Sequence, residues 1–435
     1  MSVRGAAFLG IGAMVGAGIF ALLGEAGAVA GSAVWISFLL AGIVATLLAY
    51  NVVKLGTRYP SSGGLIAYLL QGFGNGRLVG IASWLGYFAA IVIVCAMVAV
   101  AFGSYATSLF VGDDAGAAWD NVFTSGIVIA MAAINLVGTR VVDKAQSLIV
   151  VILLAVFAVF IVVTITDVDP DLLAFSGYPP LSDIIASVAL TFFAFLGFSV
   201  ITFSVGDLRE PARELPKAMY LALGVTSATY VLIALGVFGT LTVDQVVGYG
   251  ETAIAEAARP TLGDAGFAIM AVAALLATAS SVNATLYASA GLTTTLADAG
   301  QFPPVFGRTS PLGSHGGMLL TTAIVVVVSN LVDLSAIAAV GSACSLLIFL
   351  LVGLAGYRLR AATGARGPIV LVGMAVTCVV LVFFAVDTLD NAPETFAAII
   401  GIAVLAVVLD LVWKHVRRPP APASPEAPAA GALPS

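Results

Sequence analysis

Long, uninterrupted runs of apolar residues constrain this chain more than any other feature of its sequence. Of its 435 residues, 61% are hydrophobic and only 9% are charged, whereas a soluble domain carries about a quarter charged residues. Bilayer hydrocarbon offers the backbone no hydrogen-bond partner, so only helices and closed barrels span it. The runs here are continuous and do not alternate as the strands of a barrel do. The sequence therefore predicts an all-α integral membrane protein.

Twelve of the runs come close to the length of about 20 residues that crosses a bilayer as a helix. In chain order, the predicted spans are Gly5–Leu23, Ser32–Val53, Leu78–Phe110, Val122–Val137, Ser147–Thr166, Ile184–Val205, Ala218–Leu241, Gly266–Leu292, Met318–Val332, Ala336–Tyr357, Pro368–Val386 and Thr395–Trp413. Residues 414–435 follow, and their Pro- and Ala-rich end predicts a disordered cytoplasmic tail.

The positions of the basic residues test this count independently, because Lys and Arg accumulate on the cytoplasmic side of membrane proteins. With the N-terminus inside, all of the 17 Lys and Arg residues except Arg259 fall in inner connections or at the two ends. A missed or invented span in the middle of the chain would destroy this separation. The sequence thus predicts a multi-pass protein of the plasma (cell) membrane with both termini in the cytoplasm.

Sequence motifs of catalysis and cofactor binding are missing from the chain, which has no Walker loop, no HExxH and no basic nucleic-acid patch. The cysteines Cys95, Cys344 and Cys378 lie inside apolar runs, where they are expected to be small buried side chains rather than disulfide or zinc ligands. We therefore expect no enzymatic activity, no resident cofactor and no nucleic-acid partner. The expected partners are a small-molecule substrate and the lipid bilayer.

The first predicted span is unusually rich in glycine, with Gly10, Gly12, Gly16 and Gly18 inside the segment that ends at Phe20. Glycine weakens a helix and lets a ligand approach the backbone, which suits a binding site in an opened helix. The spacing of Gly12 and Gly16 also suits close packing of two helices. Spacing alone favours neither interpretation.

The sixth span carries a related motif, Thr191-Phe-Phe-Ala-Phe-Leu-Gly-Phe-Ser199, followed by the charged segment from Gly206 to Lys217. Together with Arg58-Tyr-Pro-Ser-Ser-Gly-Gly64 and Asp298-Ala-Gly-Gln-Phe-Pro303, these segments resemble the amino acid–polyamine–organocation (APC) family of permeases. The resemblance extends from about Arg4 to about Trp413.

The resemblance to the APC family implies a fold of two inverted five-helix repeats in which the first and sixth helices are unwound. The first repeat would occupy residues 1–166 and the second residues 184–357, with two peripheral spans in residues 368–413 and the tail in residues 414–435. Spans one and six are then symmetry partners, and matching broken segments in two halves point to a substrate site. This favours the opened-helix interpretation of the glycines.

The same resemblance implies which residues bind substrate. The amides of Ala17, Gly18 and Ile19 would face a carboxylate, as unpaired amides at a helix start do. The carbonyls of Met14, Phe193 and Leu196 would face an ammonium group, and the Phe193 ring would cover the site from outside. The full predicted set is Met14, Val15, Gly16, Ala17, Gly18, Ile19, Phe193, Ala194, Leu196, Gly197 and Ser199.

Departures from the family pattern narrow the expected substrate. Ser199 stands where members that handle cations often carry an acid, and no Asp, Glu, Lys or Arg lies deep in any predicted span. A charged substrate side chain would meet no counter-ion, so we expect a secondary transporter of neutral amino acids. The alternatives are a proton-coupled or exchange transporter of another small amine or polyamine, or, from a different class, a channel or a membrane sensor.

A sodium site is the last expectation. Some proton-coupled members place a Lys in the fifth span, where this chain has Leu153, whereas Ala277-Thr-Ala-Ser-Ser-Val282 resembles the stretch that holds Na⁺ in sodium-coupled relatives of the fold. Hard oxygen donors suit such an ion, although Ser pairs in membrane helices also bond back to the preceding turn. The predicted ligands are the Ser280 and Ser281 hydroxyls and the carbonyls of Gly12, Val15 and Ala277.

Overall fold

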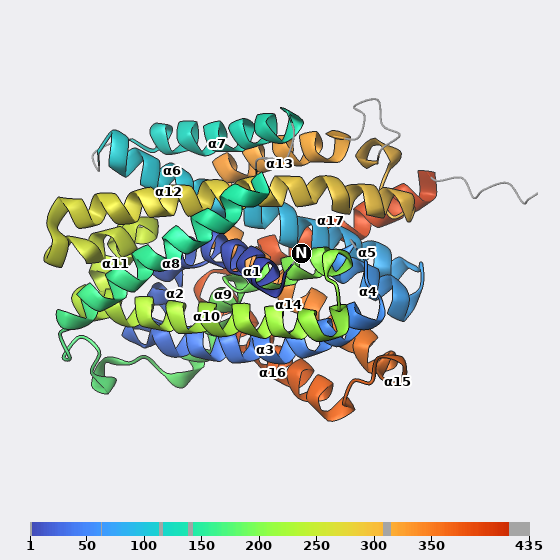
Figure 1. Ribbon diagram of the computed structural model, residues 1–435, viewed down its shortest axis with the longest axis horizontal. Helices are drawn as coiled ribbons and strands as arrows, with labels where there is room; N and C mark the ends of the chain where they lie inside the picture. The colour runs from blue at the N-terminus through green and yellow to red at the C-terminus, as the bar shows by residue number, and fades with distance from the viewer. Residues whose placement is uncertain (1, 62, 113–115, 138–141, 308–314, 417–435) are drawn as a thin grey trace, which may run out of the picture.

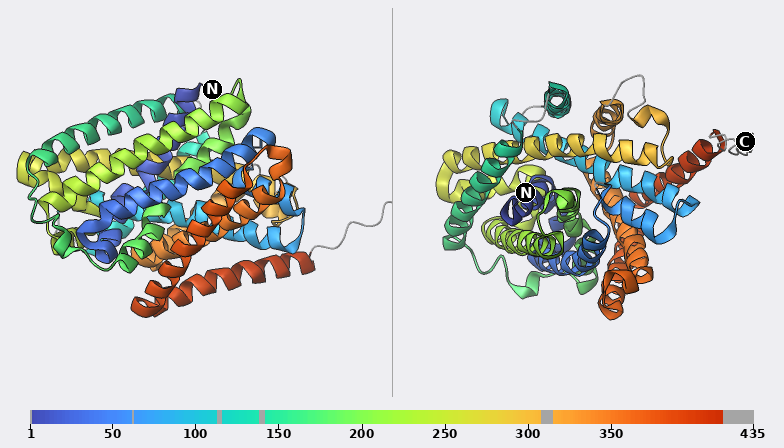
Figure 2. Two further views of the ribbon diagram at one scale, coloured as in Figure 1. Left: turned by 90° about the horizontal axis from the view of Figure 1, so that it is seen from below. Right: turned by 45° about the vertical axis from the view of Figure 1, so that its right-hand side comes forward.

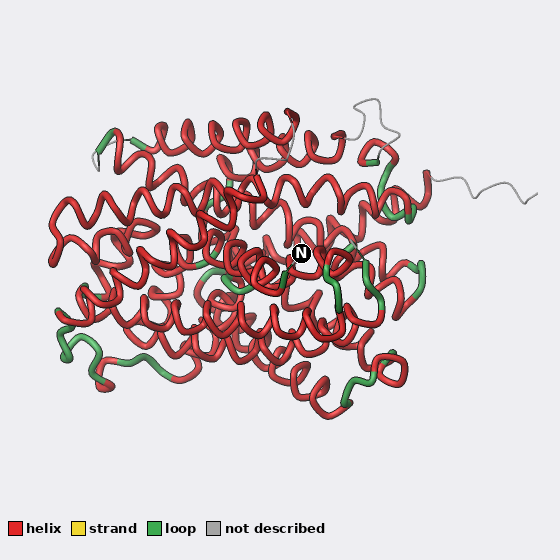
Figure 3. The backbone as a smooth tube through the Cα atoms, in the orientation of Figure 1, coloured by secondary structure: helices red, strands yellow, loops and turns green. Residues whose placement is uncertain are grey.

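The computed structural model describes residues 2–61, 63–112, 116–137, 142–307 and 315–416, and all regular structure in these ranges is helical (Figure 3). The elements of the first half are α1 (Val3–Ala17), α2 (Ile19–Ala30), η1 (Gly31–Ala33), α3 (Val34–Arg58), α4 (Gly64–Phe73), α5 (Arg77–Tyr87), η2 (Phe88–Ile93), α6 (Val94–Phe110), α7 (Ala117–Val137) and α8 (Val142–Thr166).

The second half continues the helical pattern. Its elements are η3 (Phe175–Gly177), α9 (Leu181–Phe193), η4 (Leu196–Asp207), α10 (Pro211–Thr240), α11 (Val243–Tyr249), η5 (Gly250–Thr252), α12 (Ala253–Asp298), η6 (Pro304–Phe306), α13 (Gly316–Leu331), α14 (Leu334–Arg358), α15 (Arg360–Thr363), α16 (Gly367–Asn391) and α17 (Pro393–Val416). The prediction of an all-α protein is confirmed for the described residues.

Ten helical stretches in the described ranges are long and apolar enough to cross a membrane, two fewer than the predicted twelve. The difference has two physical causes. The stretch Ile19–Arg58 joins the end of the first predicted span to the second, because α2, η1 and α3 follow one another without a loop. The ninth predicted span, α13, is apolar but has only 16 residues.

The helices form an elongated bundle with α1 near its centre (Figures 1 and 2). Helix α1 contacts α10, η4, α12 and α8, and α3 packs along α10 and α9. Helices α16 and α17, orange to red in the left view of Figure 2, lie along one side of the bundle. Helix α17 continues to Val416, so it includes the first three residues of the segment predicted to be disordered, and the rest of that segment lies outside the described residues.

Hydroxyl side chains in the apolar helices mostly bond to the preceding turn of their own helix. Thr278 donates to the Ala274 carbonyl at 2.6 Å, and Ser342 donates to the Ala338 carbonyl at 2.7 Å. A hydroxyl without a partner in an apolar environment is costly, and this local bond satisfies it without a neighbour. Hydroxyls that depart from the pattern therefore mark places with a different environment.

Candidate functional site

The first break in a membrane helix lies at Gly18, between α1 and α2. The Gly18 backbone has φ −105° and ψ −70°, and the helical pattern resumes at Ile19. The Gly18 amide donates to the Met14 carbonyl at 2.9 Å, and the Leu22 amide donates to the Gly18 carbonyl at 3.0 Å. The break is thus one residue wide. The Gly18 amide and the Met14 carbonyl, both predicted to face substrate, are bonded to each other in this structure.

The second break lies at Ala194 and Phe195, between α9 and η4. Here the bonds tighten to three-residue spacing, with the Ala194 amide donating to the Thr191 carbonyl at 3.2 Å and the Phe195 amide to the Phe192 carbonyl at 2.9 Å. The Tyr230 hydroxyl donates to the Ala194 carbonyl at 3.3 Å. The η4 segment that follows is a 12-residue 3₁₀ helix. Such helices rarely exceed four residues, and longer ones mark hinges or strained segments.

The two breaks pack directly on each other, and glycine makes this possible on both sides. A Cβ atom at Gly18 would lie 2.5 Å from the Cβ and 2.6 Å from the Cα of Ala194. A Cβ atom at Gly197 would lie 2.5 Å from the Ala13 carbonyl carbon. The glycines therefore serve close helix packing at the same place where the helices are interrupted. We call this contact the α1/η4 crossing.

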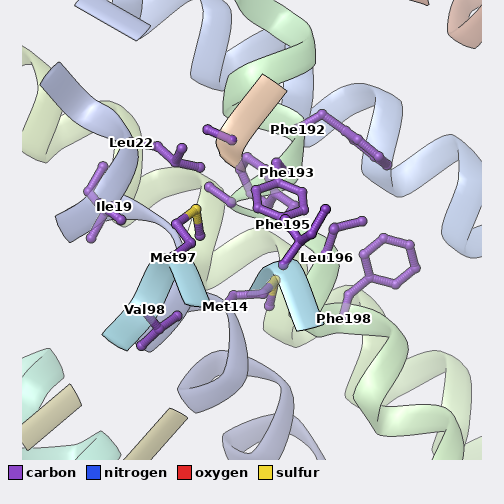
Figure 4. Packing of buried hydrophobic residues seen from close by; sticks show 14 of the residues in the cluster. Met14, Ile19, Leu22, Met97, Val98, Phe192, Phe193, Phe195, Leu196 and Phe198 are labelled. Carbon is purple, nitrogen blue, oxygen red and sulfur yellow. The ribbon is translucent and has the colours of Figure 1, made fainter. Parts of the chain in front are cut away.

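Side chains of the predicted site that come from the first span are packed away in this structure. Met14 and Ile19 are fully buried and Val15 is 1% exposed. Figure 4 shows Met14 gathered with Phe193, Phe195 and Leu196 around the crossing. Ala17 ends α1, and its side chain lies outside the described part of the chain.

A cavity of about 100 Å³ lies beside the α1/η4 crossing. It has room for several water molecules or one small organic molecule. Of the eleven predicted substrate-binding residues, the cavity brings together Phe193, Leu196, Gly197 and Ser199. Among the described residues of the first span, only Ala13 lines it, and Gly16, Gly18 and Ile19 do not.

None of the described residues that line the cavity carries a charged side chain. Its polar side chains are four hydroxyls, contributed by Ser199 of η4, Ser281 and Thr285 of α12, and Ser345 of α14. Ser199 donates to the Leu196 carbonyl at 2.9 Å. The rest of the wall is apolar or glycine, including Ile348 and Phe349 of α14. The neutral substrate class stays a prediction.

The Phe193 ring closes one side of the cavity. Phe193 is 1% exposed, and its ring lies against Gly341 of α14, where a Cβ atom would approach the ring tip to 2.5 Å. The same hypothetical atom would lie 2.6 Å from Ile93 of η2. The ring is thus held between η2 and α14. Its role as an outer lid remains a prediction.

Sequence reasoning missed the part of the cavity that comes from the third predicted span and from α14, and on α12 it singled out only Ser281, as a sodium ligand. Ala89, Ala90 and Ile91 line it from η2, a single π-helical stretch between α5 and α6. Such turns are frequent at functional sites, but nothing in an apolar run distinguishes a π turn from an α-helix. In the sequence, Thr285 and Ser345 are single hydroxyl residues in apolar spans, and no motif around them indicates a binding site.

The predicted sodium ligands come from helices that touch. A Cβ atom at Gly16 would lie 2.6 Å from the Ala277 carbonyl oxygen and 2.7 Å from the Ser281 Cβ atom. Val15 and Ala277 are each 1% exposed. The described residues contain no cluster of three or more His, Cys, Asp or Glu that could hold a metal. The set of Gly12, Val15, Ala277, Ser280 and Ser281 stays a prediction.

Comparison with known proteins places this arrangement in a family. The sequence model of the family described as amino acid permease matches residues 1–411. The chain belongs to the amino acid permease family. This confirms the resemblance to APC permeases, and it makes the chain a membrane transporter rather than an enzyme.

Several relatives of this amino acid permease have names that describe transport. The inner membrane transport protein YbaT of Escherichia coli is 30% identical over 407 residues, which are 94% of each chain. The methylthioribose transporter of Bacillus subtilis is 29% identical, over 70% of this chain and 68% of its own. The serine/threonine exchanger SteT of the same organism is 26% identical over 67% of each.

Solved structures show the same fold for the permease. A mutant of the manganese transporter of Eremococcus coleocola aligns with a TM-score of 0.62 and 14% identity, over 95% of this chain and 94% of that one. At this identity the likeness concerns the fold alone.

Proposed function

We propose that this permease is a secondary active transporter of small neutral amino acids that works by alternating access. The uncharged cavity beside the α1/η4 crossing carries the proposal. Burying an isolated charged group in such a wall costs far more than burying a neutral one, so cationic and anionic side chains are disfavoured. A cavity of about 100 Å³ also favours a small side chain.

The charged ends of an amino acid need partners that the cavity side chains do not supply. Backbone groups at the two helix breaks are the candidates, as the family resemblance implies for Met14, Ala17, Gly18 and Ile19. In this structure the contact between Gly18 and Ala194 closes that route. We infer that substrate binds when the α1/η4 crossing loosens, and that the closed crossing belongs to a state between the two open ones.

The proposed topology has twelve spans in two inverted repeats, with both termini in the cytoplasm. The helices α1 and α2 together form the first span and α9 with η4 the sixth, so each proposed repeat begins with a broken helix. The separation of basic residues supports the orientation. The proposed location is the cell membrane.

For the coupling ion we propose Na⁺, held between α1 and α12 by the predicted oxygen ligands. The contact of Gly16 with Ala277 and Ser281 supports this, because it sets the two helices close together. Exchange of one amino acid for another is the second candidate, and the relationship to the serine/threonine exchanger SteT favours it.

Uptake into proteoliposomes tests the proposal. A panel of radiolabelled neutral, cationic and anionic amino acids is presented with a Na⁺ gradient, with a pH gradient, and to vesicles preloaded with amino acid. We expect accumulation of small neutral amino acids driven by Na⁺. Accumulation of arginine or glutamate alone would refute the substrate class, whereas uptake that requires preloading would replace symport by exchange.

A further inference from the structure

Three hydroxyls in the cavity wall lack the hydrogen bond to their own helix that most other hydroxyls in the membrane helices make. Thr278, Ser289, Thr293 and Thr294 of α12 all donate to carbonyls of their own helix. Among the described residues, by contrast, Ser281, Thr285 and Ser345 make no hydrogen bond to protein, and all three line the cavity.

The position of these three hydroxyls explains the difference. Ser281 and Thr285 are four residues apart on α12, so they share one face of that helix. Ser345 lies on α14, the neighbouring wall of the same cavity, and is 4% exposed. A buried hydroxyl that forgoes the local bond loses stability unless another group supplies a partner. Ser281 and Ser345 are buried and Thr285 is half-buried, and three hydroxyls so placed at one cavity indicate a partner that enters the cavity.

From this we infer a polar subsite in which Thr285 and Ser345 hydrogen-bond a hydroxyl on the side chain of the substrate. The inference rests on the proposed function and narrows it to small neutral amino acids with a side-chain hydroxyl. A substrate hydroxyl is both donor and acceptor, so it can donate to one of these oxygens and accept from the other. Apart from the hydroxyls of Ser199 and Ser281, the rest of the described wall is apolar or glycine and offers the substrate hydroxyl no partner.

Discrimination follows from the same geometry. A site built to bond a hydroxyl rejects the analogue that lacks it, because the site's own polar groups are then left unpaired. Alanine and 2-aminobutyrate are serine and threonine without the hydroxyl, so each pair isolates this one interaction. Ser281 is set aside in the test because it also belongs to the predicted sodium ligands.

The experiment measures dissociation constants for serine, alanine, threonine and 2-aminobutyrate with purified full-length permease in nanodiscs. The variants are Thr285→Val and Ser345→Ala, which remove one hydroxyl each with little change in shape. Thr278→Val and Ser342→Ala are matched controls, because their hydroxyls lie on the same helices but bond to their own backbone.

In the unmodified permease we expect serine to bind at least about tenfold more tightly than alanine, and threonine than 2-aminobutyrate. Each cavity variant should lower these ratios by roughly three- to tenfold while changing the alanine constant by less than about threefold. The controls should keep the ratios of the unmodified protein.

Three results would overturn the inference. Equal binding of serine and alanine by the unmodified permease removes the subsite and leaves neutral amino acid transport intact. Unchanged ratios in both cavity variants assign the discrimination to other groups. No binding of any of the four compounds, by protein that is folded and monodisperse, refutes the proposed function itself and the subsite with it.

Discussion

Replacing Gly18 by alanine adds one methyl group at the tightest point of the α1/η4 crossing. The added Cβ atom would lie 2.5, 2.6 and 2.7 Å from the Cβ, Cα and carbonyl oxygen of Ala194. Two of these atoms are backbone, so no side-chain rotation relieves the contact. To reach an ordinary separation of about 3.5 to 4 Å, the two helices must move apart by roughly 1 Å at this point.

The cost of that movement sets the size of the effect. Overpacking a well-packed interior by one carbon typically costs about 1 to 3 kcal/mol. Because this cost applies to the closed crossing and not to states in which α1 and η4 have separated, it shifts the ratio of closed to open states by roughly 5- to 150-fold. We expect Gly18→Ala to favour open states, to slow transport, and to lower the midpoint of thermal unfolding in detergent.

The assay pairs initial uptake rates in proteoliposomes with labelling of a cysteine placed at Ala13, which lines the cavity. Gly224→Ala in α10 is the matched control, because nothing lies within 4 Å of a Cβ atom there. Labelling should be faster in Gly18→Ala than in Gly224→Ala. If the two variants transport, unfold and label alike, the closed crossing is not a state that the transport cycle must pass through.

Two further predictions concern other contacts. The methyl group added by Gly341→Ala pushes against the tip of the Phe193 ring, which closes one side of the cavity. We expect substrate affinity, measured by binding, to fall about tenfold, and the midpoint of thermal unfolding to change little. Unchanged affinity would show that the ring is not part of the site. The carboxylate of Asp410 is fully buried and forms an ion pair with Lys414, with an N···O distance of 3.0 Å. Lys414→Met leaves that carboxylate without its partner and should destabilise the protein by about 3 to 5 kcal/mol. Adding Asp410→Asn should restore most of that loss, and a failure to do so would assign the loss to packing.

The fold was largely predictable because its main determinant is carried by each residue separately. The hydropathy of a run is the sum of its residues' own values, and a continuous apolar run that crosses hydrocarbon can satisfy its backbone hydrogen bonds within itself only as a helix. What the runs could not convey is where one helix passes into the next without a loop, as at Gly31 between α2 and α3. The chain turns there through the positive φ of 55° at Gly31. Hydropathy carries no signal for that backbone angle, so the turn could not be predicted from the apolar runs.

The site was predictable only in part, because it depends on which atoms face one another. In the structure, glycines of the first span lie at a helix break and at close helix contacts, and their part in substrate binding stays a prediction. The sequence left an opened helix and close helix packing as alternatives, because both follow from the absence of a side chain at glycine. Thr285 and Ser345 gave no signal, because a hydroxyl that faces a cavity and one that faces its own backbone look identical in sequence.

The closed crossing and the unpaired hydroxyls together suggest how substrate choice is joined to movement. The side-chain subsite lies on α12 and α14, whereas the backbone groups predicted to bind the charged ends lie around the two breaks, between α1 and α2 and between α9 and η4. A substrate that satisfies both sets bridges the two groups of helices. Because a ligand shifts a conformational equilibrium only by its difference in affinity between states, an amino acid without the hydroxyl should bind more weakly and also drive the transition less. We therefore expect alanine, even at saturating concentration, to be transported more slowly than serine, and equal maximal rates would show that the subsite governs binding alone.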